Sequence, residues 1–177
     1  IAAVADLDTN KLATVKRRFP AVTTTTNFND LLSDPSIDAV AIATPVNTHF
    51  ELAMAALKAG KHVWVEKPMT ETFEQAQRLV EEAERRGKVL HVDHTFIYTG
   101  AVQKMAEIIK ADELGKIYYY DSIRINLGLF QRDVSVISDL AVHDFSILDH
   151  LFGEQPAAVT ASGTNHFPGT PENLAYV

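Results

Sequence analysis

Short apolar runs alternate with amphipathic segments over the first half of the chain. The apolar runs lie at residues 1–5, 39–43, 62–65 and 88–92, and the segments between them repeat apolar side chains at a helical spacing. A short apolar run is typical of a strand that is buried on both faces, and a helical spacing is typical of a helix packed on one side. Strand and helix in alternation predict a parallel sheet with helices on its faces.

Three helices are predicted in this half, over residues 9–19, 48–60 and 71–86. Thr48 and Glu51 have the spacing of a capping box, which predicts that the second helix begins there. Gly87 follows the third helix, where a glycine closes a helix in the left-handed conformation. The third helix also carries one apolar stripe, formed by Phe73, Ala76, Leu79, Val80 and Ala83.

After about residue 95 the alternation gives way to longer amphipathic elements. We expect helices over residues 102–109 and 139–152, and strands over 122–127, 159–164 and 173–177. Polar and apolar side chains alternate over 122–127, which predicts a strand with one packed and one solvated face. The change of pattern predicts two domains, over residues 1–94 and 95–177.

Asp6 directly follows the first apolar run. A dinucleotide-binding fold carries a G-x-G-x-x-G turn after its first strand and an acidic residue about 20 positions later, at the end of its second strand. Asp6 fits that acid, and no such glycine pattern occurs in the sequence. We therefore expect a fragment that lacks the first strand and phosphate loop of the fold and most of the second domain. The alternative is an acid that only starts the following helix.

Composition excludes several classes of protein and site. A net charge of −7 disfavours binding to nucleic acid or to an anionic membrane surface, so we expect a small-molecule ligand. The sequence has no cysteine, which excludes disulfides, thiolate metal sites and a cysteine nucleophile. No apolar stretch reaches the roughly 20 residues that span a bilayer, and no signal peptide opens the chain, so a cytoplasmic location is expected.

Lys67 stands at the end of the apolar run 62–65, between Glu66 and Pro68. An amine at the carboxyl end of a buried strand, followed by a proline that cannot continue the ladder, points to the crevice where α/β proteins hold ligands. Partial burial there would make the amine easier to titrate than a surface lysine. The alternative, a lysine in solvent at the end of an edge strand, is equally open on spacing alone.

Four motifs together resemble the Gfo/Idh/MocA family of nicotinamide-dependent sugar and cyclitol oxidoreductases. In chain order they are residues 5–8, 43–45 with His49, 65–68, and 138–144. The Glu-Lys-Pro motif alone is a weak signal, but four motifs in the family's order cover nearly the whole chain. The resemblance implies an α/β protein: a Rossmann-like, doubly wound parallel sheet, followed by part of an α+β substrate domain with an open sheet.

The resemblance also implies the site residues. The catalytic residues would be Lys67, Asp139 and His143, and the cofactor-binding residues Asp6, Thr44, Pro45, His49, Glu66 and Lys67. His143 is the natural base, because the ordinary pKa of histidine is about 6.5. As an ammonium, Lys67 can instead hold the substrate hydroxyl and stabilise oxyanion charge, so the proton acceptor stays open. For Asp139 and His143 the alternative is a surface pair four residues apart, and for His49 an exposed first-turn histidine.

The charges of candidate side chains predict the preferred cofactor and the class of substrate. Asp6 can accept hydrogen bonds from a ribose 2′-hydroxyl and would repel a 2′-phosphate, so NAD is favoured over NADP. Candidate substrate residues in the second domain are Tyr98, Lys104, Arg124 and Arg132, of which Tyr98 and Arg124 are preferred. Arginine suits a carboxylate or phosphate, which admits a uronic acid or nucleotide sugar, although a solvated surface arginine is the alternative. The family often has glycines where residues 134–138 stand here, so the approach of the sugar can differ.

No metal site is expected. The candidate ligands are His150 or the cluster at residues 91–94. On a strand, alternation sends His91 and Asp93 to one face and His94 to the other, so that cluster does not converge. We expect an NAD-dependent oxidoreductase that transfers a hydride between nicotinamide and a hydroxyl of a sugar, nucleotide sugar or cyclitol, and that is a homo-oligomer when full length. The alternatives are a redox-neutral, NAD-assisted lyase or glycosidase of the same family, and a non-catalytic binding protein.

Overall fold

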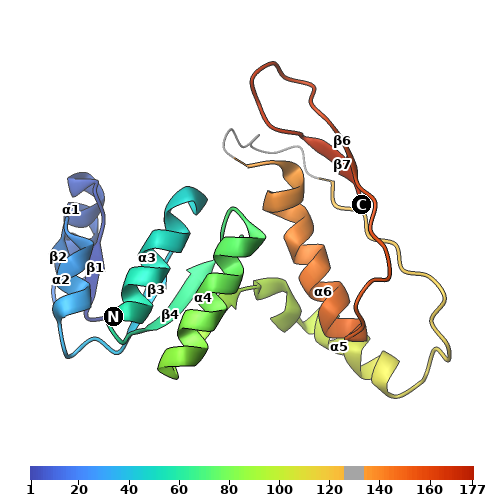
Figure 1. Ribbon diagram of the computed structural model, residues 1–177, viewed down its shortest axis with the longest axis horizontal. Helices are drawn as coiled ribbons and strands as arrows, with labels where there is room; N and C mark the ends of the chain where they lie inside the picture. The colour runs from blue at the N-terminus through green and yellow to red at the C-terminus, as the bar shows by residue number, and fades with distance from the viewer. Residues whose placement is uncertain (126–133) are drawn as a thin grey trace. The chain divides into compact units, whose positions relative to one another are not determined.

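The computed structural model describes residues 1–125 and 134–177, which form two compact units, residues 1–93 and 94–177 (Figure 1). Each unit is described by itself. Arg132 and the last two residues of the predicted strand over 122–127 lie outside the described residues. In the part that is described, no helix is both long and apolar enough to cross a membrane.

Unit 1 alternates strands and helices along residues 1–93. The elements are β1 (Ala3–Ala5), α1 (Thr9–Arg18), β2 (Thr23–Thr25), α2 (Phe28–Ser33), β3 (Ala39–Ile42), α3 (Val46–Lys58), β4 (His62–Glu66), α4 (Phe73–Arg86) and β5 (Leu90–Asp93). The predicted alternation is confirmed, and β1–β2, β3–β4 and β4–β5 all pair in parallel. The polar strand β2 and the short helix α2 are not predicted, because β2 carries no apolar pattern and α2 spans only six residues, too few for its apolar side chains Phe28, Leu31 and Leu32 to show a helical repeat.

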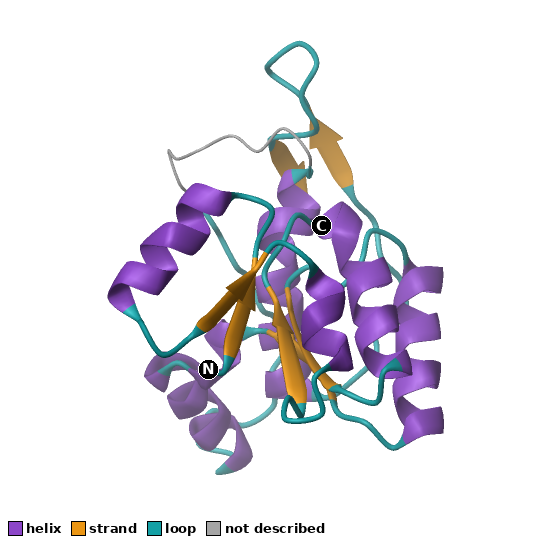
Figure 2. Cartoon of the chain, turned by 90° about the vertical axis from the view of Figure 1, so that its left-hand side faces the viewer, coloured by secondary structure: helices purple, strands orange, loops and turns teal. Residues whose placement is uncertain are grey.

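The strands of unit 1 form two groups, which are seen in Figure 2. β1 pairs with β2, and β3, β4 and β5 form a three-stranded sheet with β4 in the middle. These orders match strands 3-2 and 4-5-6 of the doubly wound dinucleotide-binding sheet, whose full order is 3-2-1-4-5-6. β1 is therefore equivalent in order to the second strand of that fold, and Asp6 directly follows it.

Helices α3 and α4 cover one face of the three-stranded sheet. The buried core there joins alternate residues of β3 and β4 to both helices: Val40, Ile42, Val63, Val65, Phe50, Ala53, Leu57, Leu79 and Ala83. On the other face Trp64 is 45% exposed. The predicted stripe on α4 is too wide, because Phe73 and Val80 are exposed. Phe73 is the first residue of the helix, and Val80 lies about 100° around the axis from the buried Leu79.

The capping box predicted at Thr48 is wrong. α3 begins at Val46, with Pro45 as its N-cap, and no side-chain hydrogen bond caps this end among the described residues. The Thr48 hydroxyl instead donates to the Pro45 carbonyl at 2.7 Å and lies 2.7 Å from the Thr44 hydroxyl. At the other helix, Gly87 closes α4 with φ at 60°, which confirms the predicted left-handed cap.

In its described residues, unit 2 contains helices and one antiparallel strand pair. Its elements are η1 (Thr95–Tyr98), α5 (Gly100–Lys110), η2 (Ile137–Ala141), α6 (Val142–Phe152), β6 (Ser162–Thr164) and β7 (Leu174–Tyr176). α5 and α6 pack through Val102, Ile147 and Leu151, so both predicted helices are confirmed. The second helix begins as a π turn, η2, rather than at Asp139.

The strand predicted over 122–127 is wrong for its described part. Residues 122–125 form no strand, and Ile123 and Ile125 are largely exposed. The polar side chains Ser122 and Arg124 instead reach Asp144 on α6, so the alternation reflects side-chain bonds to a helix rather than pairing in a sheet. The strand predicted over 159–164 is present only from Ser162.

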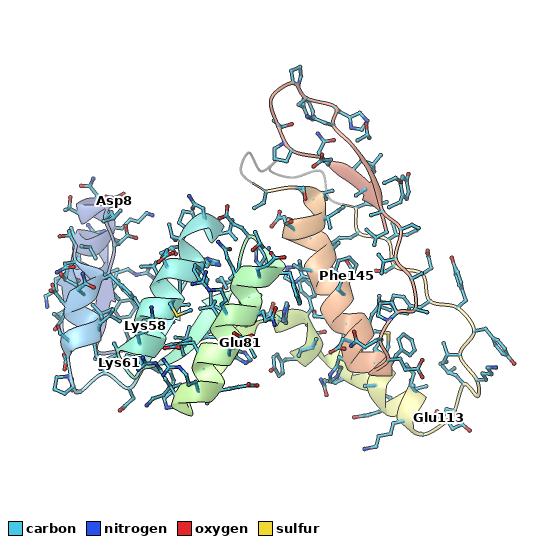
Figure 3. The ribbon with its side chains drawn as sticks, in the orientation of Figure 1. Asp8, Lys58, Lys61, Glu81, Glu113 and Phe145 are labelled. Atoms are coloured by element: carbon cyan, nitrogen blue, oxygen red, sulfur yellow. The ribbon has the colours of Figure 1, made fainter. Side chains whose placement is uncertain are left out.

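Lys61 is a buried lysine at the amino end of β4, with only 6% of its surface exposed. Its Nζ donates to the carbonyl oxygens of Asp34 at 2.6 Å and of Ile37 at 2.7 Å. These carbonyls lie in the segment between α2 and β3, so the ammonium ties that segment to the start of β4. Lys58, at the end of α3, is exposed (Figure 3).

Replacing Lys61 by methionine should destabilise the protein, because two carbonyl groups lose their donor. A buried polar group left without a partner costs about 1–3 kcal/mol, so we expect Lys61→Met to lower the free energy of unfolding by that amount in urea titrations. The matched variant Lys58→Met should change it by less than about 0.5 kcal/mol. Equal stability of the two variants would contradict this role of Lys61.

Candidate functional site

The candidate site of unit 1 lies in the loops that follow the carboxyl ends of its parallel strands. Asp6 follows β1, residues 44–45 follow β3, and residues 67–68 follow β4. Two residues labelled in Figure 3 mark the two edges: Asp8 follows the carboxyl end of β1, and Lys61 precedes the amino end of β4. Open α/β sheets bind ligands at the carboxyl edge, so the residues predicted to bind the cofactor stand where this fold places a ligand.

Asp6 is held in place by the backbone of the next turn. Its Oδ1 accepts a hydrogen bond from the Asp8 amide at 2.8 Å, and its Oδ2 lies 3.7 Å from the exposed Lys11 ammonium. Asp8 in turn accepts from the amide of Asn10 at 2.8 Å and caps α1. A carboxylate has about four lone-pair positions, so Asp6 keeps acceptor capacity for a ribose diol. This donor and acceptor set fits the ribose of a dinucleotide.

His49 is buried, with 1% of its surface exposed, so the exposed first-turn histidine is excluded. Its Nε2 lies 2.7 Å from the Thr44 carbonyl oxygen, and its Nδ1 lies 2.9 Å from the Pro68 carbonyl oxygen. The ring thus joins the loop after β3 to the loop after β4. The structure thereby brings together Thr44, His49 and the Lys67–Pro68 turn.

The Lys67–Pro68 peptide bond is cis, and both residues are half-buried, as is Glu66 at the end of β4. Lys67 is therefore not a fully solvated lysine at the end of an edge strand. β4 is also the central strand of its sheet. An amine on a turn at the carboxyl end of a central strand is suited to hydrogen bonding and proton transfer with a ligand at that edge.

The candidate residues of unit 2 gather around α6. His143 is buried in the first turn of α6, with 8% of its surface exposed, and Asp139 is half-buried in η2. This burial excludes a fully exposed surface pair. π turns often occur at functional sites, and here one carries Asp139 immediately before the histidine. The joint action of Lys67, in unit 1, with Asp139 and His143, in unit 2, stays a prediction.

Asp144, next to His143, is the centre of a polar cluster. Its carboxylate accepts hydrogen bonds from Ser122 Oγ at 2.9 Å, from Arg124 Nε at 2.9 Å and from Arg124 Nη2 at 3.2 Å. Burial alone would raise the pKa of Asp144. The hydrogen bonds from Arg124 and Ser122 and the positive charge of Arg124 outweigh it, so the pKa lies below its ordinary value.

An aromatic ring connects this cluster to His143. The Arg124 guanidinium lies 4.7 Å from the Phe96 ring centre, and the Phe96 and His143 rings have centres 4.6 Å apart. Phe96 belongs to η1, as does Tyr98, which is 63% exposed. Sequence reasoning missed Phe96 and the role of Asp144. The only sequence signal for the role of Asp144 is its position directly after His143 in the same motif.

Within residues 1–125 and 134–177, no group of three or more histidine, aspartate or glutamate side chains is arranged to hold a metal ion. His91 and Asp93 lie on β5, and His94 begins unit 2.

The sequence matches two family descriptions. Residues 1–94 match "Oxidoreductase family, NAD-binding Rossmann fold", and residues 102–176 match "GFO/IDH/MocA C-terminal domain".

Similar proteins include inositol dehydrogenases. The chain is 30% identical over 171 residues to scyllo-inositol 2-dehydrogenase (NADP(+)) IolW of Bacillus subtilis, a match covering 90% of this chain and 47% of that protein. It is 26% identical over 174 residues to myo-inositol 2-dehydrogenase of Thermotoga maritima, covering 92% of this chain and 50% of that protein. The chain spans about half the length of these relatives.

A solved structure extends the likeness to the fold. GenD2 from gentamicin A biosynthesis, in complex with NAD, matches with a TM-score of 0.85 and 26% sequence identity, over 99% of this chain and 53% of that chain. Since one family accounts for both halves of the sequence, the chain belongs to the Gfo/Idh/MocA family of oxidoreductases, and its residues 1–94 match the NAD-binding Rossmann fold of that family.

Proposed function

We propose that the protein is an NAD-dependent oxidoreductase that acts on a hydroxyl group of a sugar, nucleotide sugar or cyclitol. The observation that carries the proposal is the half-buried Lys67, on a turn at the carboxyl end of the central strand β4, joined through His49 to the Thr44 loop. The relatives named as inositol dehydrogenases support a polyol as the substrate class.

The carboxyl-edge loops of unit 1 would hold the cofactor. Asp6 would accept hydrogen bonds from the ribose hydroxyls, and its charge would disfavour a 2′-phosphate. Thr44, Pro45 and Glu66 would line the path toward the nicotinamide. When bound, NAD supplies the hydride-transfer chemistry.

Lys67 and His143 would handle the hydroxyl proton. Oxidation of a secondary alcohol requires a group within hydrogen-bond reach of the oxygen that takes its proton as the hydride leaves carbon. One of the two side chains would accept this proton, and the other would donate a hydrogen bond to the same oxygen. Asp139 would orient a neighbouring hydroxyl of the substrate.

Arg124 and Tyr98 are the proposed substrate contacts of unit 2. The Asp144 carboxylate takes two donor groups of the Arg124 guanidinium and balances its charge. An arginine neutralised in this way attracts an anion less strongly, while its other N–H groups can still donate to hydroxyl oxygens. The ion pair therefore favours an uncharged polyol over a uronic acid.

The activity is tested by NADH formation. Protein produced from its complete gene and incubated with NAD and a panel of cyclitols and sugars should accumulate NADH with at least one of them. Lys67→Met should lower kcat by about 10²–10⁴-fold, because positioned acid–base groups contribute that much. Lys58→Met, at an exposed lysine of the same unit, should leave kcat unchanged. Turnover without NADH accumulation would instead support the redox-neutral alternative, and full activity of Lys67→Met would remove the amine from the mechanism.

Asp6→Ser tests the cofactor preference. Hydrogen bonds to a charged group contribute about 1.5–3 kcal/mol, so kcat/KM for NAD should fall by about 10–150-fold. Activity with NADP should fall less or rise, because the negative charge is gone. Initial rates with both cofactors measure the ratio. An unchanged NADP-to-NAD ratio would be inconsistent with contact between Asp6 and the ribose.

Asp144→Asn tests the ion pair through its pH dependence. Because the pKa of Asp144 is lowered by folding, its stabilisation is complete above the unfolded value, about 3.9, and is lost as the pH falls through the folded value. We expect the variant to be less stable by about 1–2 kcal/mol at pH 7, with the difference shrinking below about pH 4. Urea titrations across this range measure it, with Asp149→Asn, at an exposed position of α6, as control. A pH-independent difference would rule out the charge as the cause.

A further inference from the structure

The His49 ring bridges two backbone acceptors. Nε2 lies 2.7 Å from the Thr44 carbonyl oxygen and Nδ1 lies 2.9 Å from the Pro68 carbonyl oxygen, both within hydrogen-bond distance. A carbonyl oxygen only accepts, so each contact is a hydrogen bond only when the facing ring nitrogen carries a proton: the neutral ring donates to one of the two carbonyls and packs against the other, and the doubly protonated ring donates to both. With both nitrogens facing the backbone and 1% of its surface exposed, the ring has no polar atom directed at a ligand.

The bridge lies just beyond the end of a strand ladder. The parallel pairing of β3 with β4 extends to the pair Ile42 and Val65. Thr44 comes two residues after the first member of that pair, and Pro68 three residues after the second. Past the ladder the two strands continue as loops, and the His49 ring lies between these loops, with one nitrogen facing each of them, where strand hydrogen bonds no longer join them. Lys67 lies in the loop after β4, directly before Pro68.

The ring is itself fixed by the core. His49 belongs to the first turn of α3, and the next residues on that helix, Phe50, Ala53 and Leu57, are buried against the three-stranded sheet. A polar side chain carried by a packed helix is a more rigid support than one carried by a loop. His49 therefore fixes the position of the Lys67 turn relative to α3 and the three-stranded sheet.

We propose that His49 is a positioning residue for the Lys67 amine, which it places by holding the Pro68 carbonyl against the Thr44 loop. The inference rests on the proposed function, in which Lys67 handles the substrate hydroxyl. It replaces the direct cofactor contact expected for His49 with an action through the backbone. Misplacing a reacting group by about 1 Å can cost about 10²-fold in rate, so loss of the bridge should be seen in kcat.

A second histidine of the same unit provides a matched control. His62 Nδ1 accepts a hydrogen bond from the Val89 amide at 2.9 Å, at the amino end of β4. It is thus another histidine with a hydrogen bond to the backbone, but at the opposite end of the strand from Lys67. If a histidine that binds the backbone only stabilises the fold, His62→Phe and His49→Phe should have similar effects.

The test is a double-mutant cycle in the purified protein from the complete gene, with kcat measured for NAD reduction. We expect His49→Phe to lower kcat at least tenfold in the natural background and to have little further effect when combined with Lys67→Met, because positioning matters only while the amine is present. His49→Gln, which keeps N–H donors, should recover part of the loss. His62→Phe should leave kcat within about twofold.

Hydrogen exchange gives a readout that is independent of activity. His49→Phe should speed amide exchange in the segment 66–72, whereas His62→Phe should speed it near residue 89. If His49→Phe does not fold, His49→Leu takes its place in both measurements, and His49→Gln stays the variant that should recover part of the loss.

The possible results distinguish failure of the positioning role of His49 from failure of the proposed function. An unchanged kcat in His49→Phe, an equal fold-loss with and without Lys67, or unchanged exchange over 66–72 would each overturn the positioning role. Full activity of Lys67→Met alone would overturn the proposed function instead.

Discussion

Parallel pairing of β3, β4 and β5 in a single register is the constraint on which the candidate site of unit 1 depends. Val40, Ile42, Val63 and Val65 all face α3 and α4, and a slip of one residue would turn such a set to the opposite face of the sheet. The burial of these residues therefore sets where β3 and β4 end. The positions of Thr44 and Lys67 follow from those ends, so apolar packing determines where the polar chemistry stands.

In each unit a buried histidine ring contacts other groups of the same unit. In unit 1 two carbonyl oxygens hold His49, whereas in unit 2 the Phe96 ring lies against His143 and is in turn covered by Arg124. Asp144 completes the second arrangement by orienting the guanidinium. The first ring thus lies between two carbonyl groups of the backbone, and the second lies beside another aromatic ring, tilted from it by 60°.

The sequence predicted elements whose signal is local and missed contacts that join distant residues. The strand at 62–66 and the left-handed end of α4 at Gly87 follow from an apolar run and a single glycine. The partner of His49 lies 19 residues away, at Pro68, and the partner of Ser122 lies 22 residues away, at Asp144. Such distances carry no periodic signal. The alternation over 122–127 therefore predicts a strand, although in its described part, residues 122–125, it serves contacts to a helix.

The two faces of the three-stranded sheet differ in one further respect. Val63 and Val65 turn toward the helices, so Trp64 between them turns the other way, and it is the only tryptophan in the sequence. Its indole, 45% exposed on the central strand, is paired in register with Ala41 and His91. Tryptophan fluorescence of this chain, excited selectively beside its five tyrosines, consequently reports the polarity of that one face, and anything that covers the face must displace the water around one indole.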